Sequence, residues 1–162
     1  MQRPLIIGVM GGGSASAKDC EDAYRLGRLI ATEGWVLLNG GRNAGIMEAS
    51  ARGAADHGGL TVGILPDDHK ASAAASIKLP IPTGMGSARN VINVLASDVV
   101  VGCPGGAGTL SEIALALKHG KIVILLNFDT GTVFSEYRRK GQLSEVASPQ
   151  AAIDRIRSHC AR

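Results

Sequence analysis

One stretch decides the fold: Val99-Val100-Val101-Gly102-Cys103-Pro104-Gly105-Gly106-Ala107-Gly108-Thr109-Leu110-Ser111-Glu112. Its β-branched start predicts a buried strand and its glycines predict a turn. Apolar residues then recur at the spacing of one helical face, which predicts a helix packed on the core. These residues are Leu110, Ile113, Ala114 and Leu117. Glycines let backbone N–H groups approach a ligand, and a helix N-terminus adds unpaired donors. The stretch therefore predicts a phosphate site.

Strand and helix patterns alternate along the rest of the chain. Strands are expected at residues 5–10, 35–38, 60–65, 77–81, 98–102 and 122–126. Helical spacing covers residues 18–33, 46–57, 88–95 and 110–117, and it resumes after Pro149. Most strands are continuously apolar, as expected for strands covered on both faces. The sequence therefore predicts an α/β fold, a single Rossmann-like domain over residues 1–162 with a doubly wound parallel sheet of six or seven strands.

Some local features carry their own expectations. Gly34 is placed to end the first helix. Pro80 suits an edge strand, because it cannot donate to a sheet ladder. Residues 67–76 show no clear period and are expected to form a loop or a frayed helix. The core face of the third helix is expected to carry apolar side chains. These are Ala88, Val91, Ile92 and Leu95.

Glycine-rich segments follow four of the strands, at residues 11–13, 40–45, 84–86 and 105–108. The loops after parallel strands all emerge at one edge of the sheet, and ligands bind in the crevice there. We therefore expect these segments to converge on one pocket.

Composition narrows the class of partner. The net charge is +3, and aromatic residues make up only 3% of the chain. The basic excess lies in residues 138–162 and not beside the glycine loops, so nucleic-acid binding has little support. The three cysteines are far apart, without a CxxC or a zinc-like His pair, which favours a reduced, cytoplasmic setting without a metal site. No apolar run approaches the ~20 residues of a membrane span, so no membrane association is expected.

Two charged residues are candidates for chemistry. Arg89 lies at the start of a predicted helix, where the dipole disfavours a cation, so it is either a clamp for phosphate or carboxylate or a solvent-exposed side chain. Thr109 and Glu112 fit a capping box, which alone would explain both. Glu112 would alternatively hold a ribose hydroxyl or a reacting water.

The remaining glycine loops are less specific. The first glycine run does not fit a dinucleotide fingerprint, and no GK[ST] follows any glycine cluster, so neither NAD nor FAD is expected. No lysine lies in a context that suggests a pyridoxal phosphate Schiff base. Residues 39–45 could either contact a ligand or form a structural turn. Glu48 could reach the crevice, but an acidic residue in the first turn of a helix is also favoured by the helix dipole alone.

The chain resembles the LOG and lysine-decarboxylase-like superfamily over roughly residues 5–127. Five segments carry the likeness in order: Asn39-Gly40-Gly41, Gly45-Ile46-Met47-Glu48, Gly63-Ile64-Leu65-Pro66, Gly86-Ser87-Ala88-Arg89-Asn90 and Pro104 to Glu112. The last, PGGxGTxxE, is the most specific. The resemblance implies that these loops bind a phosphorylated pterin or nucleotide. The implied ligand-binding residues are Gly12, Gly13, Ser14, Asn39, Gly40, Gly41, Gly45, Met47, Glu48, Gly84, Arg89, Asn90, Pro104, Gly105, Gly106, Gly108, Thr109 and Glu112.

Two branches of this superfamily compete. LOG-type phosphoribohydrolases cleave the base from nucleoside 5′-monophosphates, and by likeness Arg89 would orient the substrate while Glu112 supports the cationic transition state or its water. Arg89 and Glu112 would be the catalytic residues in that case. The molybdenum cofactor carrier branch instead binds, protects and transfers a phosphate-bearing molybdopterin without chemistry.

The chain departs from the hydrolase pattern in two segments. Hydrolases typically read His-x-Arg-Lys where this chain reads Ser87-Ala88-Arg89-Asn90, and Glu-Glu where it reads Ser111-Glu112. These departures favour the carrier branch. The resemblance then implies molybdenum cofactor as cargo, molybdoenzymes as recipients, and a homo-oligomer, either dimer or tetramer.

Overall fold

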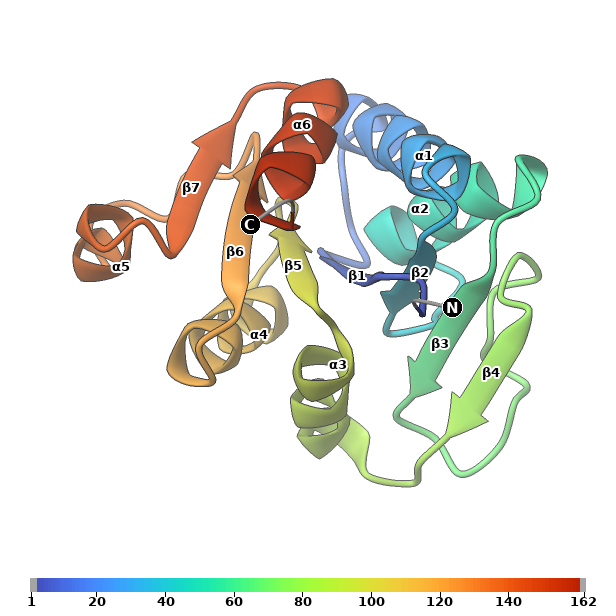
Figure 1. Ribbon diagram of the computed structural model, residues 1–162. Helices are drawn as coiled ribbons and strands as arrows, with labels where there is room; N and C mark the ends of the chain where they lie inside the picture. Colours follow the sequence, from blue (N-terminus) through green and yellow to red (C-terminus); the bar gives the residue numbers. More distant parts are fainter. Residues whose placement is uncertain (1–2, 161–162) are drawn as a thin grey trace.

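The apolar runs form seven strands of one parallel sheet in the computed structural model, which describes residues 3–160 (Figure 1). The strands are β1 (Ile6–Met10), β2 (Val36–Asn39), β3 (Thr61–Leu65), β4 (Leu79–Pro82), β5 (Val99–Gly102), β6 (Ile122–Leu126) and β7 (Leu143–Val146). They lie in the order β4-β3-β2-β1-β5-β6-β7, and every neighbouring pair is parallel.

Helices cover both faces of this sheet. On one face lie α1 (Ala17–Thr32), α2 (Gly45–Asp56) and α6 (Pro149–Cys160), and on the other α3 (Asn90–Ala96) and α4 (Ala107–Lys118) (Figure 1). A 3₁₀ turn, η1 (Gly86–Arg89), leads into α3, and the short α5 (Ser135–Arg139) precedes β7. The predicted doubly wound, Rossmann-like α/β fold is confirmed.

The strands bury side chains on both faces, which explains their continuous apolar character. In β1, Ile7 and Val9 join the core under α1, α2 and α6, whereas Met10 joins the core under α3 and α4. All three are at most 1% exposed. A parallel sheet is covered by helices on both faces, so the side chains on both faces are removed from water.

Most local predictions are confirmed. Gly34 follows α1 with φ +72°, a conformation that glycine adopts without strain. Residues 67–76 form an irregular segment of turns and bends. Pro80 lies in edge strand β4, which begins two residues later than predicted, because Ile77 donates its N–H to Ala74 in a turn instead of joining the ladder.

The predicted core faces of α3 and α4 are confirmed only in part: Ile113 and Leu117 of α4 are buried in the core, and Ile92 of α3 packs against it. Leu95 is 50% exposed and Leu110 is 39% exposed. Several of the positions turned inward carry polar side chains instead: Asn90 and Asn93 on α3, and Glu112 on α4. These polar residues pack toward each other across the two helices, so the apolar spacing identified only part of each buried face.

Glycine brings α1 and α2 into backbone contact. A Cβ on Gly27 would lie 2.0 Å from the carbonyl oxygen of Ser50, and one on Gly53 would lie 2.0 Å from that of Tyr24. Such distances leave no room for a methyl group unless the helices separate.

We expect Gly53→Ala to lower the free energy of unfolding by about 1–3 kcal/mol, because overpacking forces the two backbones apart. The matched control is Gly108→Ala in α4, where an added Cβ meets nothing within 4 Å. Alanine has the higher helix propensity, so this control should be as stable as the wild type or slightly more stable. Urea denaturation of both variants measures the difference; equal stabilities would contradict the packing argument.

Candidate functional site

The strand order reverses between β1 and β5, and the loops that follow these two strands meet there. Gly12 donates its N–H to the carbonyl oxygen of Pro104 at 2.9 Å, and Cys103 donates to that of Met10 at 2.7 Å. In open α/β sheets, ligands bind at such a switch point. The two glycine loops are therefore held together at the edge where a ligand crevice is expected.

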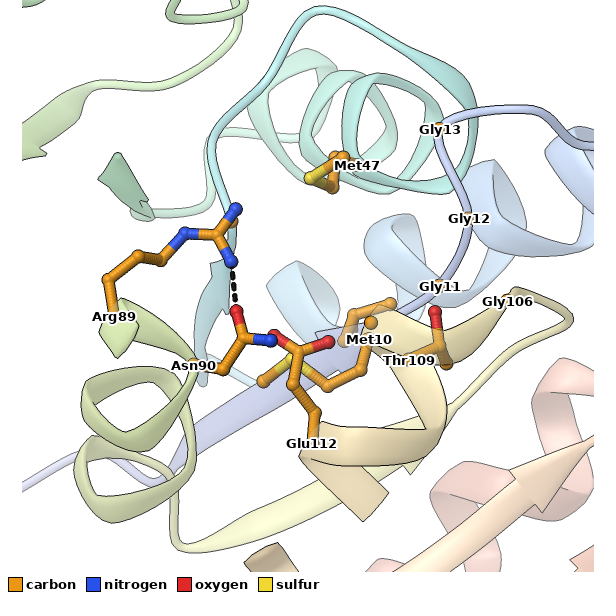
Figure 2. A pocket seen from close by; sticks show the side chains of 13 residues that line it. Met10, Gly11, Gly12, Gly13, Met47, Arg89, Asn90, Gly106, Thr109 and Glu112 are labelled. Atoms are coloured by element: carbon orange, nitrogen blue, oxygen red, sulfur yellow. Dashed lines mark hydrogen bonds between the residues drawn. The ribbon is translucent and has the colours of Figure 1, made fainter. Parts of the chain in front are cut away.

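A cavity of about 230 Å³ opens at this edge (Figure 2). The glycine segments 11–13, 40–45 and 105–108 contribute to it, whereas segment 84–86 does not, and Arg89 and Asn90, which follow that segment, line it instead. The predicted residues that line it are Gly12, Gly13, Gly40, Met47, Arg89, Asn90, Gly106, Gly108, Thr109 and Glu112. Figure 2 shows the side chains of Arg89, Asn90 and Glu112 pointing into the same space.

The N-terminus of α4 forms one end of the cavity. Gly106 occupies the N-cap position and no side chain caps the helix. The first-turn N–H groups of a helix have no partner inside the helix, and they carry partial positive charge. This end can therefore accept a phosphate on backbone donors alone, with Gly106 and Gly108 leaving room for close approach.

The capping-box interpretation of Thr109 and Glu112 is wrong. Since α4 begins at Ala107, Thr109 already lies in its first turn and Glu112 in its second. Glu112 is 7% exposed and accepts a hydrogen bond from Asn93 Nδ2 at 2.7 Å. Its burial raises the pKa of the carboxyl group, while the Asn93 hydrogen bond and the charge of Arg89 act in the opposite direction. The cavity thus holds a desolvated acid beside a cation.

Arg89 ends the 3₁₀ turn and lies against the glycine loop after β2. A Cβ on Gly40 would lie 2.8 Å from a terminal nitrogen of Arg89 and 2.9 Å from Met47 Sδ, so glycine makes space for the guanidinium. Burial lowers the pKa of Arg89, and its buried Nε has no hydrogen-bond partner within the described residues. An unsatisfied buried donor costs about 1–3 kcal/mol. Arg89 thus keeps a buried donor that no group of the described residues satisfies.

A hydrogen-bonded chain fixes Arg89 to α4. Arg89 donates to Asn90 Oδ1, Asn90 Nδ2 donates to Ser111 Oγ at 3.0 Å, and Ser111 Oγ donates to the carbonyl oxygen of Gly108 at 2.7 Å. Asn90 and Ser111 stand where the hydrolases typically have Lys and Glu. The structure joins these departures into one neutral pair beside the guanidinium.

Several predicted residues lie outside the cavity lining: Ser14, Asn39, Gly41, Gly45, Glu48, Gly84, Pro104 and Gly105. Asn39 is fully buried and organises its loop, accepting the N–H of Gly41 at 2.8 Å and donating to the carbonyl oxygen of Met47 at 2.9 Å. Glu48 pairs with Arg52 on the surface of α2. These residues shape the loops that present the lining.

Two lining residues, Val9 and Met10, were not predicted, and Gly11 was expected only as part of the glycine segment 11–13. They end β1 and begin its loop, directly at the reversal of strand order. The glycine run after a buried strand was the available signal, but the switch point is fixed only once the strand order is known.

Cys103 is not a nucleophile in this setting. It is 2% exposed, and burial raises the pKa of its thiol to about 12. Within residues 3–160, no group of three or more His, Cys, Asp or Glu side chains lies close enough together to hold a metal ion. Among the same residues, no helix combines the length and the apolar character that crossing a membrane requires.

The raised pKa of Glu112 predicts a pH-dependent stability. Between the ordinary glutamate pKa and the higher folded value, the folded state binds more protons than the unfolded state, so stability falls as pH rises through this window. Glu112→Gln should remove that fall and be more stable than the wild type above the window. Urea denaturation from pH 4 to pH 8 measures it, with Glu48→Gln, a change at a half-buried glutamate paired with Arg52, as the control. A parallel pH profile for wild type and Glu112→Gln would contradict it.

The similar solved structures match this chain almost end to end. The molybdenum cofactor binding protein from the phototrophic bacterium Rippkaea orientalis is 49% identical, covers 99% of both chains and has a TM-score of 0.93. A molybdenum cofactor carrier protein from Chlamydomonas reinhardtii is 40% identical, covers 98% of this chain and 99% of that one, and has a TM-score of 0.89.

The hydrolase branch matches over a shorter region. The cytokinin riboside 5′-monophosphate phosphoribohydrolase of Mycobacterium marinum is 34% identical over 101 residues, which are 57% of this chain and 51% of the relative. The chain thus spans about half the length of that enzyme. The model of the SLOG cluster4 family matches residues 4–153. The predicted LOG-like relationship, close to the carrier branch, is confirmed, and the chain belongs to the SLOG cluster4 family.

Proposed function

We propose that this protein binds molybdenum cofactor, protects it and passes it on without chemical change. The observation that carries the proposal is the 49% identity over 99% of both chains with a molybdenum cofactor binding protein. The hydrolase relative supports its alternative over only 57% of the chain.

The cavity suits a phosphate-bearing pterin. The uncapped N-terminus of α4 offers backbone donors to the phosphate. Met10 and Met47 place thioether side chains in the lining, and such side chains pack well against flat aromatic rings. Arg89, with its unpartnered Nε, supplies a cation for a further acceptor of the ligand. The lining thus offers surfaces for the phosphate and for one part of the pterin ring.

The neutral Asn90–Ser111 pair supports binding over hydrolysis. It holds Arg89 through hydrogen bonds of 3.0 Å and 2.7 Å that lead to the backbone of α4, and it adds no second acid or base beside Glu112. Such a site can bind a ligand, but Glu112 is then the one buried carboxylate in the lining that could transfer a proton.

Direct titration tests the proposal. Molybdenum cofactor released from a molybdoenzyme is added to the purified protein under anaerobic conditions, and bound pterin is quantified after gel filtration as its fluorescent oxidation product. We expect about one pterin per chain, with AMP as a weaker competitor. Elution of the pterin wholly apart from the protein would refute the proposal.

The alternative function is a phosphoribohydrolase acting on nucleoside 5′-monophosphates. The observation that favours it is the burial of Glu112, 7% exposed, beside Arg89, because a desolvated carboxylate can act as a general acid or base. Ribose 5-phosphate release from AMP or a cytokinin ribotide, lost in Glu112→Gln, would establish it. The absence of turnover at high enzyme concentration would remove it.

Self-association, molybdoenzymes as recipients of the cargo and a cytoplasmic location complete the proposed role. Sedimentation analysis of the purified chain tests the first of these. We expect a dimer or a tetramer, and a monomer at micromolar concentration would oppose it.

A further inference from the structure

A second hollow of about 300 Å³ adjoins the cavity at the switch point. It shares Arg89, Asn90 and Gly108 with that cavity, and Arg42, Gly86 and Ser87 add its own walls. Arg89 therefore lies between two connected spaces. We call this second space the Arg42 hollow.

The small volume of the first cavity suggests that a ligand bound there extends into the Arg42 hollow. Its 230 Å³ lies below the range of about 300–1,000 Å³ typical of small-molecule sites. A pterin or nucleotide whose phosphate lies at the N-terminus of α4 needs more room than this cavity gives. The shared residues make the Arg42 hollow the adjoining space into which it can extend.

The Arg42 hollow also carries an unusual charge arrangement. Arg42 and Arg89 both line it, and like charges at one surface repel unless an anion lies between them. Asp67 compensates only in part, because its Oδ1 lies 3.6 Å from Arg42, too far for a hydrogen bond. Within residues 3–160, the Arg42 side chain donates no hydrogen bond and Arg89 donates one, from Nη1 to Asn90. Both guanidinium groups thus retain donors for an added acceptor.

The backbone under Arg42 is held in place. Gly41 adopts φ +76°, donates its N–H to Asn39 Oδ1 at 2.8 Å and accepts the N–H of Ala74 at 2.8 Å. An isolated antiparallel bridge then pairs Arg42 with Ala73. The loop therefore fixes the point from which the Arg42 side chain extends toward the hollow.

We propose that the Arg42 hollow is a second anion subsite. The ligand is then a phosphate ester with two anionic centres, its phosphate at the N-terminus of α4 and its second centre between Arg42 and Arg89. In molybdenum cofactor, the second centre is the oxo-metal end. This inference rests on the proposed function for the identity of the ligand, but not for the existence of the subsite.

Oxyanion stoichiometry tests the subsite without the cofactor. Equilibrium dialysis with molybdate at millimolar concentration should give two anions per chain for the wild type and one for Arg42→Gln, with Arg42→Lys intermediate in affinity. The control Arg52→Gln changes an arginine on α2 that pairs with Glu48 outside both spaces, and it should bind two. One anion in the wild type, or two in Arg42→Gln, overturns the inference.

Cofactor binding then connects the subsite to the ligand. Arg42→Gln should weaken binding of the metal-loaded cofactor at least tenfold and binding of the metal-free pterin phosphate less than twofold. Equal weakening of the two would overturn the assignment of the metal end. If the wild type binds neither pterin, the proposed function fails, while the dialysis result still decides whether the second subsite exists.

Discussion

Replacing Arg89 by alanine is expected to weaken ligand binding by about 100-fold or more. The guanidinium lies between the cavity and the Arg42 hollow, partly buried, with an unpartnered Nε. Removing one partner from a desolvated, charge-assisted contact typically costs 2–5 kcal/mol, and each 1.4 kcal/mol is a factor of ten in affinity. Titration of the variant with molybdenum cofactor measures the effect.

The same variant should keep its folding stability. Arg89 forms no ion pair within 4 Å among the described residues, so its loss removes a desolvated cation and little native bonding. The matched control is Arg52→Ala on the exposed face of α2, which should bind normally. Wild-type affinity in Arg89→Ala would show that the ligand lies elsewhere. A large loss of stability would assign Arg89 a structural role instead.

Gly105→Ala should damage both the fold and the site. An added Cβ would lie 2.1 Å from Thr109 Oγ1, 2.7 Å from Thr109 Cβ and 2.8 Å from the backbone nitrogen of Gly12. Because Thr109 is 4% exposed and Gly12 is backbone, neither can move aside freely. We expect a loss of about 1–3 kcal/mol in the free energy of unfolding. Displacement of the loop should also weaken ligand binding at least tenfold.

Gly13→Ala is the control for this prediction. It lies in the facing loop and lines the same cavity, but its Cβ would meet only the Cβ of Ala44 at an ordinary 3.7 Å. Denaturant unfolding of the two variants should separate them clearly. If Gly105→Ala matched Gly13→Ala in stability, the close approach of the two loops would not be needed.

The architecture was predictable because parallel strands buried on both faces leave a plain apolar signature. Runs such as Val99 to Gly102 and Ile122 to Leu126 contain no polar residues, so they are easily recognised as buried strands. The strand β7 (Leu143–Val146) was harder to place, because it carries Ser144 and Glu145 and lies at the edge of the sheet. Edge strands face water on one side, so their sequences are less distinctive.

The predicted helix faces failed at the site itself. Apolar spacing assigned Leu95 and Leu110 to the core, but both are exposed. Asn93 and Glu112 take the inward positions, because they bond to each other at 2.7 Å. A polar residue can face inward only when its partner is present, and that partner lies on another helix. The spacing of residues within one helix cannot predict a contact with another helix.

The pairing of Asn90 with Ser111 was equally hidden. The sequence showed two separate departures from the hydrolase pattern, 21 positions apart, and the structure joins them through one hydrogen bond of 3.0 Å. The convergence of the glycine loops, by contrast, followed from topology alone, since every loop after a parallel strand emerges at one edge.

The most direct test of the proposed carrier role measures the lifetime of the cofactor. Free molybdenum cofactor is exposed to air with the wild-type protein, with Arg89→Ala and with no protein, and the surviving active cofactor is assayed by reconstitution of a cofactor-free molybdoenzyme. The wild type should prolong survival several-fold and release cofactor that reconstitutes the enzyme, whereas Arg89→Ala should give nearly the unprotected decay. Equal decay with and without the wild-type protein would contradict the account.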